Sequence, residues 1–166
     1  AYSSILRADI DQLKFDLEGD GWNVIEKLIH NQAPDTTVKR VLVQEYNKDP
    51  NNVKAVYLLG NIAVPYSGTN DMNPDGITNN FGAWPADAFY SDVRQRFWPD
   101  LNYTWSTGKR TNMRGDGKYD RETTMQNAEL AVGRVDFSRL TYSSKTEDQL
   151  MRDYLKKARA YKYKEY

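Results

Sequence analysis

The sequence contains no cysteine and only one histidine, His30. The missing thiols exclude disulfide bonds, cysteine nucleophiles and cysteine-ligated metal sites, and no second histidine is present to complete a hydrolase site. His30 follows an apolar run that ends at Ile29, so it is interpreted as a structural residue at the end of a strand. By itself, the chain cannot be a cysteine, zinc or serine hydrolase.

Net charge and long apolar runs are missing as well. Lys plus Arg and Asp plus Glu number 23 each, so the chain lacks the basic excess with which proteins neutralise nucleic-acid phosphates. No stretch approaches the roughly 20 apolar residues of a membrane span. The N-terminus, Ala1–Ser4, has no charged or hydrophobic signal region, so any signal peptide is expected to have been removed. Nucleic acid is therefore not an expected partner, and no membrane span is expected.

What the chain does contain is typical of a globular protein. Hydrophobic residues make up 39% of its 166 residues, and aromatic residues 13%, with 12 Tyr and 4 Trp. Tyr and Trp combine a large apolar area with a polar tip, which suits binding surfaces and also a core that ends in broad polar loops. We expect a single α/β domain or sub-domain over residues 1–166, with irregular loops at 65–86 and 93–127.

Three helices are predicted from apolar periodicity. The first carries a stripe over Leu6–Leu17, follows a cap at Ser3 or Ser4, and ends at Gly19. The second begins within Pro34–Thr37. The last runs from Ser144 to Tyr163, where Ser144 and Glu147 have the spacing of a capping box.

Four segments are predicted to be strands. Residues 53–60 and 129–135 are nearly continuous apolar runs of the kind found in strands buried on both faces of a parallel sheet. Residues 22–29 alternate weakly, and 88–90 form a short apolar segment. Helices alternating with such strands indicate an α/β fold with a mainly parallel sheet and helices on both faces.

The segment 82–90 is the first candidate site. In open α/β sheets, ligands bind beyond the carboxyl ends of the strands, where the long loops begin. Asp87 lies there beside Trp84 and Tyr90, which suits an acidic pocket for a basic side chain. The alternative is that the Asp87 carboxylate merely caps backbone N–H groups.

The segment 112–120 looks like a calcium loop, with oxygen ligands at alternating positions and a glycine at the turn. It is not an EF-hand, because Arg114 and Thr123 stand where that loop needs its second carboxylate and its bidentate glutamate. An irregular calcium site and an Asp-Gly turn that binds nothing both remain open. The candidate ligands are Asp92, Asp100, Asp116 and Asp120.

Five blocks together resemble gingipain-type cysteine peptidases and their secreted bacterial relatives. They cover most of residues 53–161, and their order and spacing, rather than any single block, carry the resemblance. The blocks are Val56–Gly60, Val64–Gly68, Gly82–Asp87, Gly115–Asp120 and Glu129–Val135.

The resemblance implies a caspase-like fold and a secreted or cell-surface location. It implies that the chain is the N-terminal, non-catalytic part of a peptidase (hydrolase) domain whose His and Cys lie beyond residue 166. In this family an acidic residue that receives a basic substrate side chain would match Asp87, and calcium would bind in the irregular loops. One departure is Ile77, which stands where the nearest relatives have a histidine, and this puts the role of that loop in doubt.

Two alternatives belong to other classes of protein. One is a stand-alone secreted binding or structural module without enzymatic activity. The other is a glycan-binding domain built on Trp84, Trp98 and Trp105. If the chain is half of a sheet, we expect a second polypeptide or a second copy of the chain as partner. That partner would contact Leu130, Val132 and the apolar stripe of the last helix.

Overall fold

The computed structural model describes residues 2–67, 84–94, 98, 100, 102–104, 111–119 and 128–165. Contacts divide the chain into two compact units. Unit 1 comprises Ala1–Gln32, Leu58–Ile62 and Arg134–Tyr166, and unit 2 comprises Ala33–Tyr57 and Ala63–Gly133. The chain is mixed helix and strand with small parallel sheets, which confirms the predicted α/β class.

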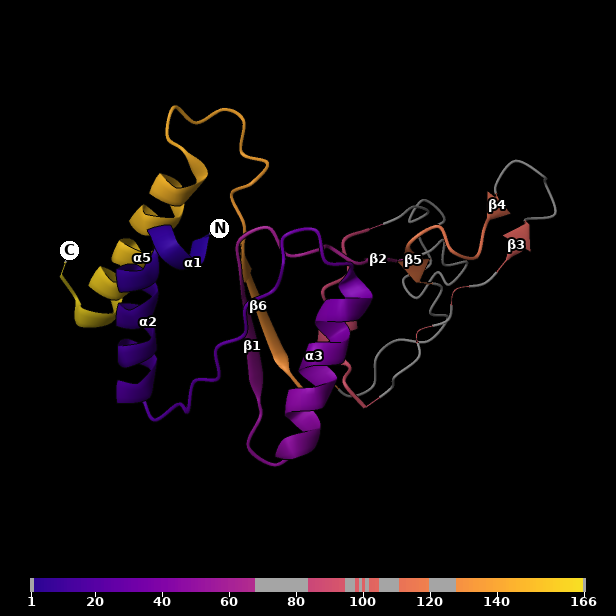
Figure 1. Ribbon diagram of the computed structural model, residues 1–166, viewed down its shortest axis with the longest axis horizontal. Helices are drawn as coiled ribbons and strands as arrows, with labels where there is room; N and C mark the ends of the chain where they lie inside the picture. Colours follow the sequence, from indigo (N-terminus) through magenta and orange to yellow (C-terminus); the bar gives the residue numbers. More distant parts are fainter. Residues whose placement is uncertain are drawn as a thin grey trace. The chain divides into compact units, whose positions relative to one another are not determined.

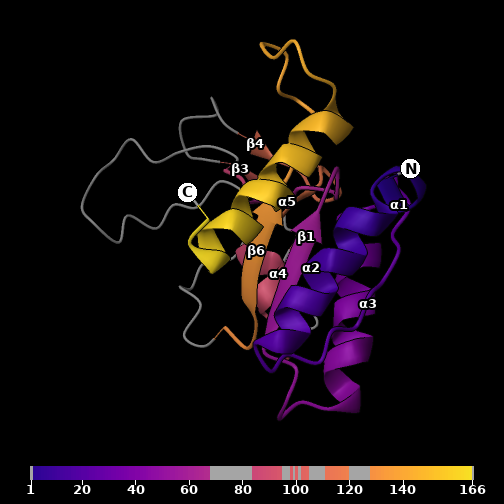
Figure 2. The same ribbon diagram turned by 90° about the vertical axis from the view of Figure 1, so that its left-hand side faces the viewer.

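Unit 1 is built on helices α1 (Tyr2–Ile5), α2 (Arg7–Gly19) and α5 (Glu147–Tyr163). Helices α2 and α5 lie side by side (Figure 1; Figure 2). The predicted apolar stripes meet there, and each fully buried side chain of this size contributes roughly 1.5–3 kcal/mol. The buried core residues are Leu6, Val135, Met151 and Leu155.

Polar contacts tie α2 to α5 around the buried Asp16. Arg159 Nη1 lies 3.0 Å from Asp16 Oδ1, and Tyr163 donates its hydroxyl proton to the same oxygen over 3.1 Å. Nearer the start of α2, Arg152 Nε lies 3.1 Å from Asp9 Oδ2. The carboxylate taken into this interface is therefore both paired and hydrogen-bonded, as a buried charge requires.

The ends of these helices partly match the prediction. Helix α2 ends at Gly19 as expected, and Gly21 follows in the left-handed region, at φ +89°. The expected cap at Ser3 or Ser4 is wrong, because α1 already begins at Tyr2. The capping box of α5 lies two residues after the predicted position. Thr146 and Gln149 form it, rather than Ser144 and Glu147.

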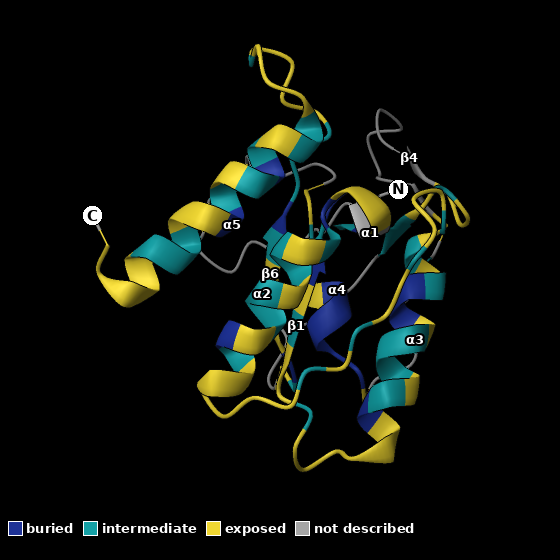
Figure 3. Ribbon diagram, turned by 60° about the vertical axis from the view of Figure 1, so that its left-hand side comes forward, coloured by how far each residue is buried: buried dark blue, intermediate teal, exposed yellow. Residues whose placement is uncertain are grey.

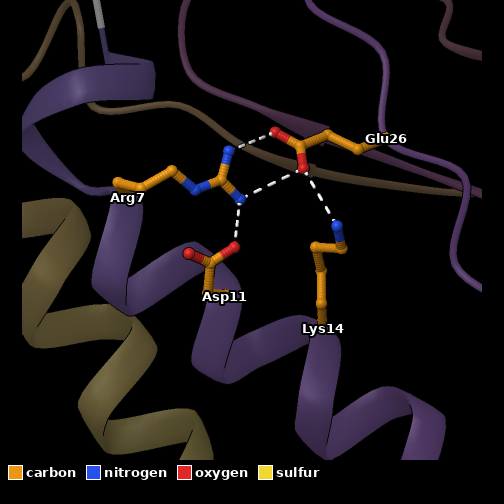
Figure 4. A network of polar contacts seen from close by, with 4 residues as sticks. All are labelled: Arg7, Asp11, Lys14 and Glu26. Atoms are coloured by element: carbon orange, nitrogen blue, oxygen red, sulfur yellow. Dashed lines mark hydrogen bonds and ion pairs between the residues drawn. The ribbon is translucent and has the colours of Figure 1, made fainter.

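The predicted strand at 22–29 is wrong, since residues 22–30 contain neither helix nor strand. Its exposed apolar residues, Trp22, Ile25 and Leu28, recur every third position and so cannot line one face of a strand. Glu26 is instead held against α2 by Arg7 and Lys14 (Figure 4). His30 is therefore not at a strand end. Its Nδ1 accepts the backbone N–H of Gln32 at 3.2 Å.

Unit 2 holds α3 (Asp35–Lys48), α4 (Ala88–Ser91) and short strands. These strands are β2 (Tyr66–Ser67), β3 (Tyr103–Thr104), β4 (Thr111–Asn112) and β5 (Lys118–Tyr119). The core contains Tyr46, Val93 and Leu130. The predicted strand at 88–90 is wrong, because this segment is the buried helix α4 (Figure 3). Backbone N–H groups there donate back to nearby carbonyls, as from Tyr90 to Asp87 at 2.9 Å.

Strands β1 (Ala55–Leu59) and β6 (Ala131–Val135) pair with each other. Ala131 N donates to Lys54 O at one end and Gly60 N to Val135 O at the other, each over 2.8 Å, so the pairing is parallel. Both strands lie within the segments predicted for them. The expectation of a partner contact is wrong for Leu130, Met151 and Leu155, because these side chains are buried inside the two cores. Tyr161 of the same stripe is 77% exposed, and for it and Val132 the contact stays a prediction.

Candidate functional site: a buried lysine among aromatic rings

Three segments that carry the resemblance lie against one another in unit 2. Strand β2 pairs in parallel with β5, with Tyr66 opposite Lys118 and Ser67 opposite Tyr119. On its other side, Tyr66 forms an antiparallel bridge with Pro85. Residues 64–67, 84–87 and 115–119, far apart in the sequence, therefore form one loop cluster.

The residues predicted to bind substrate lie in different environments. Asp87 precedes α4 and is half-buried. Trp84 is 59% exposed, whereas Tyr90 is fully buried and donates its hydroxyl proton to the carbonyl oxygen of Ala63 over 2.7 Å. The three side chains therefore do not share one open surface, and their role in substrate binding stays a prediction.

The predicted calcium ligands already accept hydrogen bonds. The buried Asp92 accepts from Trp98 Nε1 over 2.9 Å. Asp100 accepts the backbone N–H of Gly115 with both oxygens, at 3.0 and 2.8 Å. Asp116 accepts the backbone N–H of Lys118 at 3.0 Å and pairs with its ammonium group at 2.8 Å.

The contacts of Asp100 and Asp116 hold the turn at 113–118 together. Asp120 lies outside the described residues. Within the described ranges, no three acidic or histidine side chains gather as metal ligands would. Calcium binding therefore stays a prediction.

Lys39 of α3 was not predicted from the sequence, yet it lies at the centre of unit 2. Its side chain is buried, and its ammonium group donates to the carbonyl oxygens of Phe89 and Asp92. Its Nζ atom lies 4.5 Å from the centroid of the Phe89 ring and 5.8 Å from that of Trp98. Both distances allow a cation–π interaction, which gains strength where water is excluded. In the sequence, the one indication that Lys39 is buried is that it follows the apolar Val38.

The two rings beside this lysine belong to a cluster of three aromatic side chains. Phe89 and Tyr119 stack at 4.3 Å with an interplanar angle of 15°. Trp98 meets both rings edge to face, at 5.4 and 6.2 Å. Such pairs add about 0.5–1.5 kcal/mol each beyond the area they bury, so the cluster is a rigid wall.

Tyr119 ends in a hydrogen bond to α3. Its hydroxyl donates to Asp35 Oδ1 over 3.0 Å. Burial raises the pKa of Tyr119, and the charge of Asp35 and the hydrogen bond to it raise this pKa further. The phenol therefore remains protonated and keeps its role as donor.

A cavity of about 560 Å³ opens beside this wall. Helix α3 supplies one side, and Phe89 of α4 together with residues between 98 and 119 supplies the other. Its principal lining residues are Lys39, Arg40, Phe89, Trp98, Arg114 and Tyr119. The cavity combines a flat apolar wall with cationic side chains, which suits it to a ligand that has both an apolar and an anionic part.

Comparisons with known proteins give no relative for this chain: no family model, no curated protein and no solved structure matches it. In the part of the chain that the structure describes, no helix is long and apolar enough to cross a membrane.

Proposed function

We propose that the chain is the non-catalytic N-terminal portion of a secreted, gingipain-like cysteine peptidase domain. It would supply one wall of the substrate pocket. The observation that supports this proposal is that the blocks of the resemblance pair with one another. Block 56–60 pairs with 129–135 as β1 with β6, and block 64–68 contacts blocks 115–120 and 82–87 through β5 and Pro85.

This pairing is independent of the resemblance itself. The resemblance rests on the order of the blocks along the chain, and order alone does not require them to be neighbours in space. Segments that build one site of a family are expected to converge, because a pocket is formed by loops that meet at one place. The described parts of these blocks form two such groups, β1 with β6, and residues 64–67 with 84–87 and 115–119.

The peptidase chemistry would require residues from outside this sequence. The chain has no thiol, and its one imidazole accepts a local backbone N–H through Nδ1. The nucleophile and its base would come from further sequence of a longer protein or from a second polypeptide. Within these 166 residues, Asp87 would receive a basic substrate side chain, because a charge-assisted hydrogen bond to a carboxylate selects Arg or Lys.

Fluorogenic peptides that differ only in the residue before the scissile bond test this proposal. The full gene product is expected to cleave after Arg or Lys in a thiol-dependent reaction, whereas the 166-residue chain alone has no activity. Asp87→Asn should lower kcat/KM for the basic peptides by about tenfold or more, and it should leave cleavage of a neutral peptide unchanged.

Asp11→Asn is the matched control, because Asp11 is an exposed carboxylate of α2 that pairs with Arg7 of its own helix. A gene product without a cysteine or without thiol-dependent cleavage would contradict the proposal. It would favour the stand-alone binding or structural module.

Calcium binding by the loops at 93–127 belongs to the same proposal. A ligand that binds only the folded state stabilises it by RT ln(1 + [L]/Kd), about 2.7 kcal/mol at a hundredfold excess over Kd. We expect a higher melting temperature in millimolar calcium than in chelator, and we expect Asp116→Ala to abolish the difference. Identical melting curves in the two buffers would remove calcium from the proposal.

A further inference from the structure

We propose that the cavity of unit 2 binds a small anionic molecule with a flat apolar body. The guanidinium groups of Arg40 and Arg114 would hold its carboxylate or phosphate, and the aromatic wall would contact its body. This site does not depend on the peptidase proposal, because Asp87, Trp84 and Tyr90 are not among its lining residues.

Size and rigidity favour a small organic molecule. At about 560 Å³, the cavity falls within the roughly 300–1,000 Å³ of small-molecule sites. Phe89, Trp98 and Tyr119 are fixed by their mutual ring contacts, and Tyr119 is fixed also by its bond to Asp35. A preformed wall lowers the ordering cost of binding.

The arginines of the cavity differ from those of unit 1. Arg7, Arg152 and Arg159 each pair with a carboxylate at 3.1 Å or less. Over the described ranges, no carboxylate forms an ion pair with Arg40 or Arg114. Arg40 makes one long hydrogen bond, 3.4 Å to the Thr37 hydroxyl. The fork of donors on an arginine matches carboxylate and phosphate oxygens, so these two side chains have the chemistry for an anion.

The remaining charges of the lining leave a positive excess. The lining residues that the structure describes include one carboxylate, that of Asp100. Both of its oxygens accept the Gly115 N–H. Lys39 adds a third cation at the aromatic wall. Three cations against one carboxylate give the cavity a net positive charge, which favours an anion and disfavours a cation.

Four naphthalene compounds with the same ring test the proposal by isothermal titration calorimetry. The probes are 1-naphthoate, 1-naphthyl phosphate, 1-naphthalenemethanol and 1-naphthylmethylamine. The two anions are expected to bind about tenfold or more tightly than the alcohol, and the amine most weakly. The ratio of the two anions reports which head group the arginines prefer.

Arg40→Gln and Arg114→Gln are each expected to weaken anion binding by about tenfold, with the melting temperature of the free protein unchanged. Arg139→Gln is the matched control, because Arg139 is an exposed arginine of unit 1. Equal affinities for all four probes would overturn the proposal. Undiminished anion binding by the Arg40→Gln/Arg114→Gln double variant would overturn it as well.

Discussion

Glu26 holds the segment 22–30, which contains neither helix nor strand, against α2 through side-chain contacts. Its carboxylate lies 2.8 Å from Arg7 Nη1 and 3.2 Å from Lys14 Nζ (Figure 4). Hydrogen bonds from Arg7 and then Lys14 lower the pKa of Glu26 from 4.5 to about 2, and burial opposes them. A lowered pKa means that the folded state favours the charged carboxylate.

The Glu26 carboxylate stabilises the fold fully at pH values above the pKa that Glu26 has in the unfolded chain. This stabilisation is lost as the pH falls through the lower pKa that Glu26 has in the folded chain. The window therefore runs from about pH 4.5 to about pH 2. Because these side chains are partly exposed, Glu26→Gln should cost only about 0.5–1 kcal/mol at pH 7. Urea unfolding should show this difference shrinking as the pH falls below 4.5.

Glu18→Gln is the control for this prediction, since Glu18 is an exposed carboxylate of the same unit with no ion pair in the described part of the chain. It should leave both the stability and its pH dependence unchanged. A Glu26→Gln protein that loses stability equally at pH 7 and pH 3 would show that the carboxylate's charge is not what matters.

Lys39→Met tests the buried ammonium group. The substitution keeps the apolar stem but leaves the carbonyl oxygens of Phe89 and Asp92 without this donor. An unmade buried hydrogen bond costs about 1–3 kcal/mol, so urea unfolding should show a loss of that size. Lys48→Met, an exposed change in the same helix, should have little effect. A more stable Lys39→Met protein would mean that desolvation of the charge outweighs its bonds.

At the scale of elements, what the sequence could predict depended on how local the signal was. Strands β1 and β6 and helices α2, α3 and α5 were predicted because each carries its own apolar run or stripe. The strand prediction at 22–29 is wrong because the conformation of this segment depends on Arg7 and Lys14 of α2, which pair with Glu26. Lys39 was missed for the same reason, since its partners Phe89 and Asp92 lie about 50 residues away in the sequence.

Helix α5 begins with a capping box: the backbone N–H of Thr146 donates to Gln149 Oε1 over 2.9 Å, and the Thr146 side chain accepts the backbone N–H of Gln149. Thr146→Ala removes the side-chain oxygen that satisfies the first turn, at a cost of about 1 kcal/mol. Thermal unfolding should show the lower stability. Thr141→Ala, an exposed change in the preceding turn, should not. If both variants have the melting temperature of the wild type, the cap does not contribute to the stability of α5.

At the scale of the whole molecule, unit 1 leaves large apolar side chains uncovered. Exposed fractions are 56% for Ile5, 68% for Phe15, 49% for Trp22, 51% for Ile25 and 72% for Leu28. Monomeric proteins seldom leave large apolar areas open to water. These side chains support the proposal that a second polypeptide or a second copy of the chain completes the molecule.

Sedimentation velocity at low micromolar concentration should therefore show species heavier than the monomer when the chain is alone. Phe15→Lys should shift the population towards monomer, because a charge cannot be buried unpaired in an interface. Tyr142→Lys is the control, since Tyr142 is fully exposed in the turn before α5. A wild-type chain that stays monomeric throughout would contradict the prediction.

The pairing of α2 with α5 also has a consequence for the order of synthesis. Asp16 and Arg159 are 143 residues apart in the sequence, so α2 leaves the ribosome long before the helix that covers its apolar stripe exists. Unit 2, by contrast, has both of its segments once residue 133 has been made. Unit 1 therefore cannot complete its fold until segment 134–166 has been made, and until then the apolar stripe of α2 lacks the cover that α5 provides. Helix α2 is therefore made early but is among the last helices to be packed.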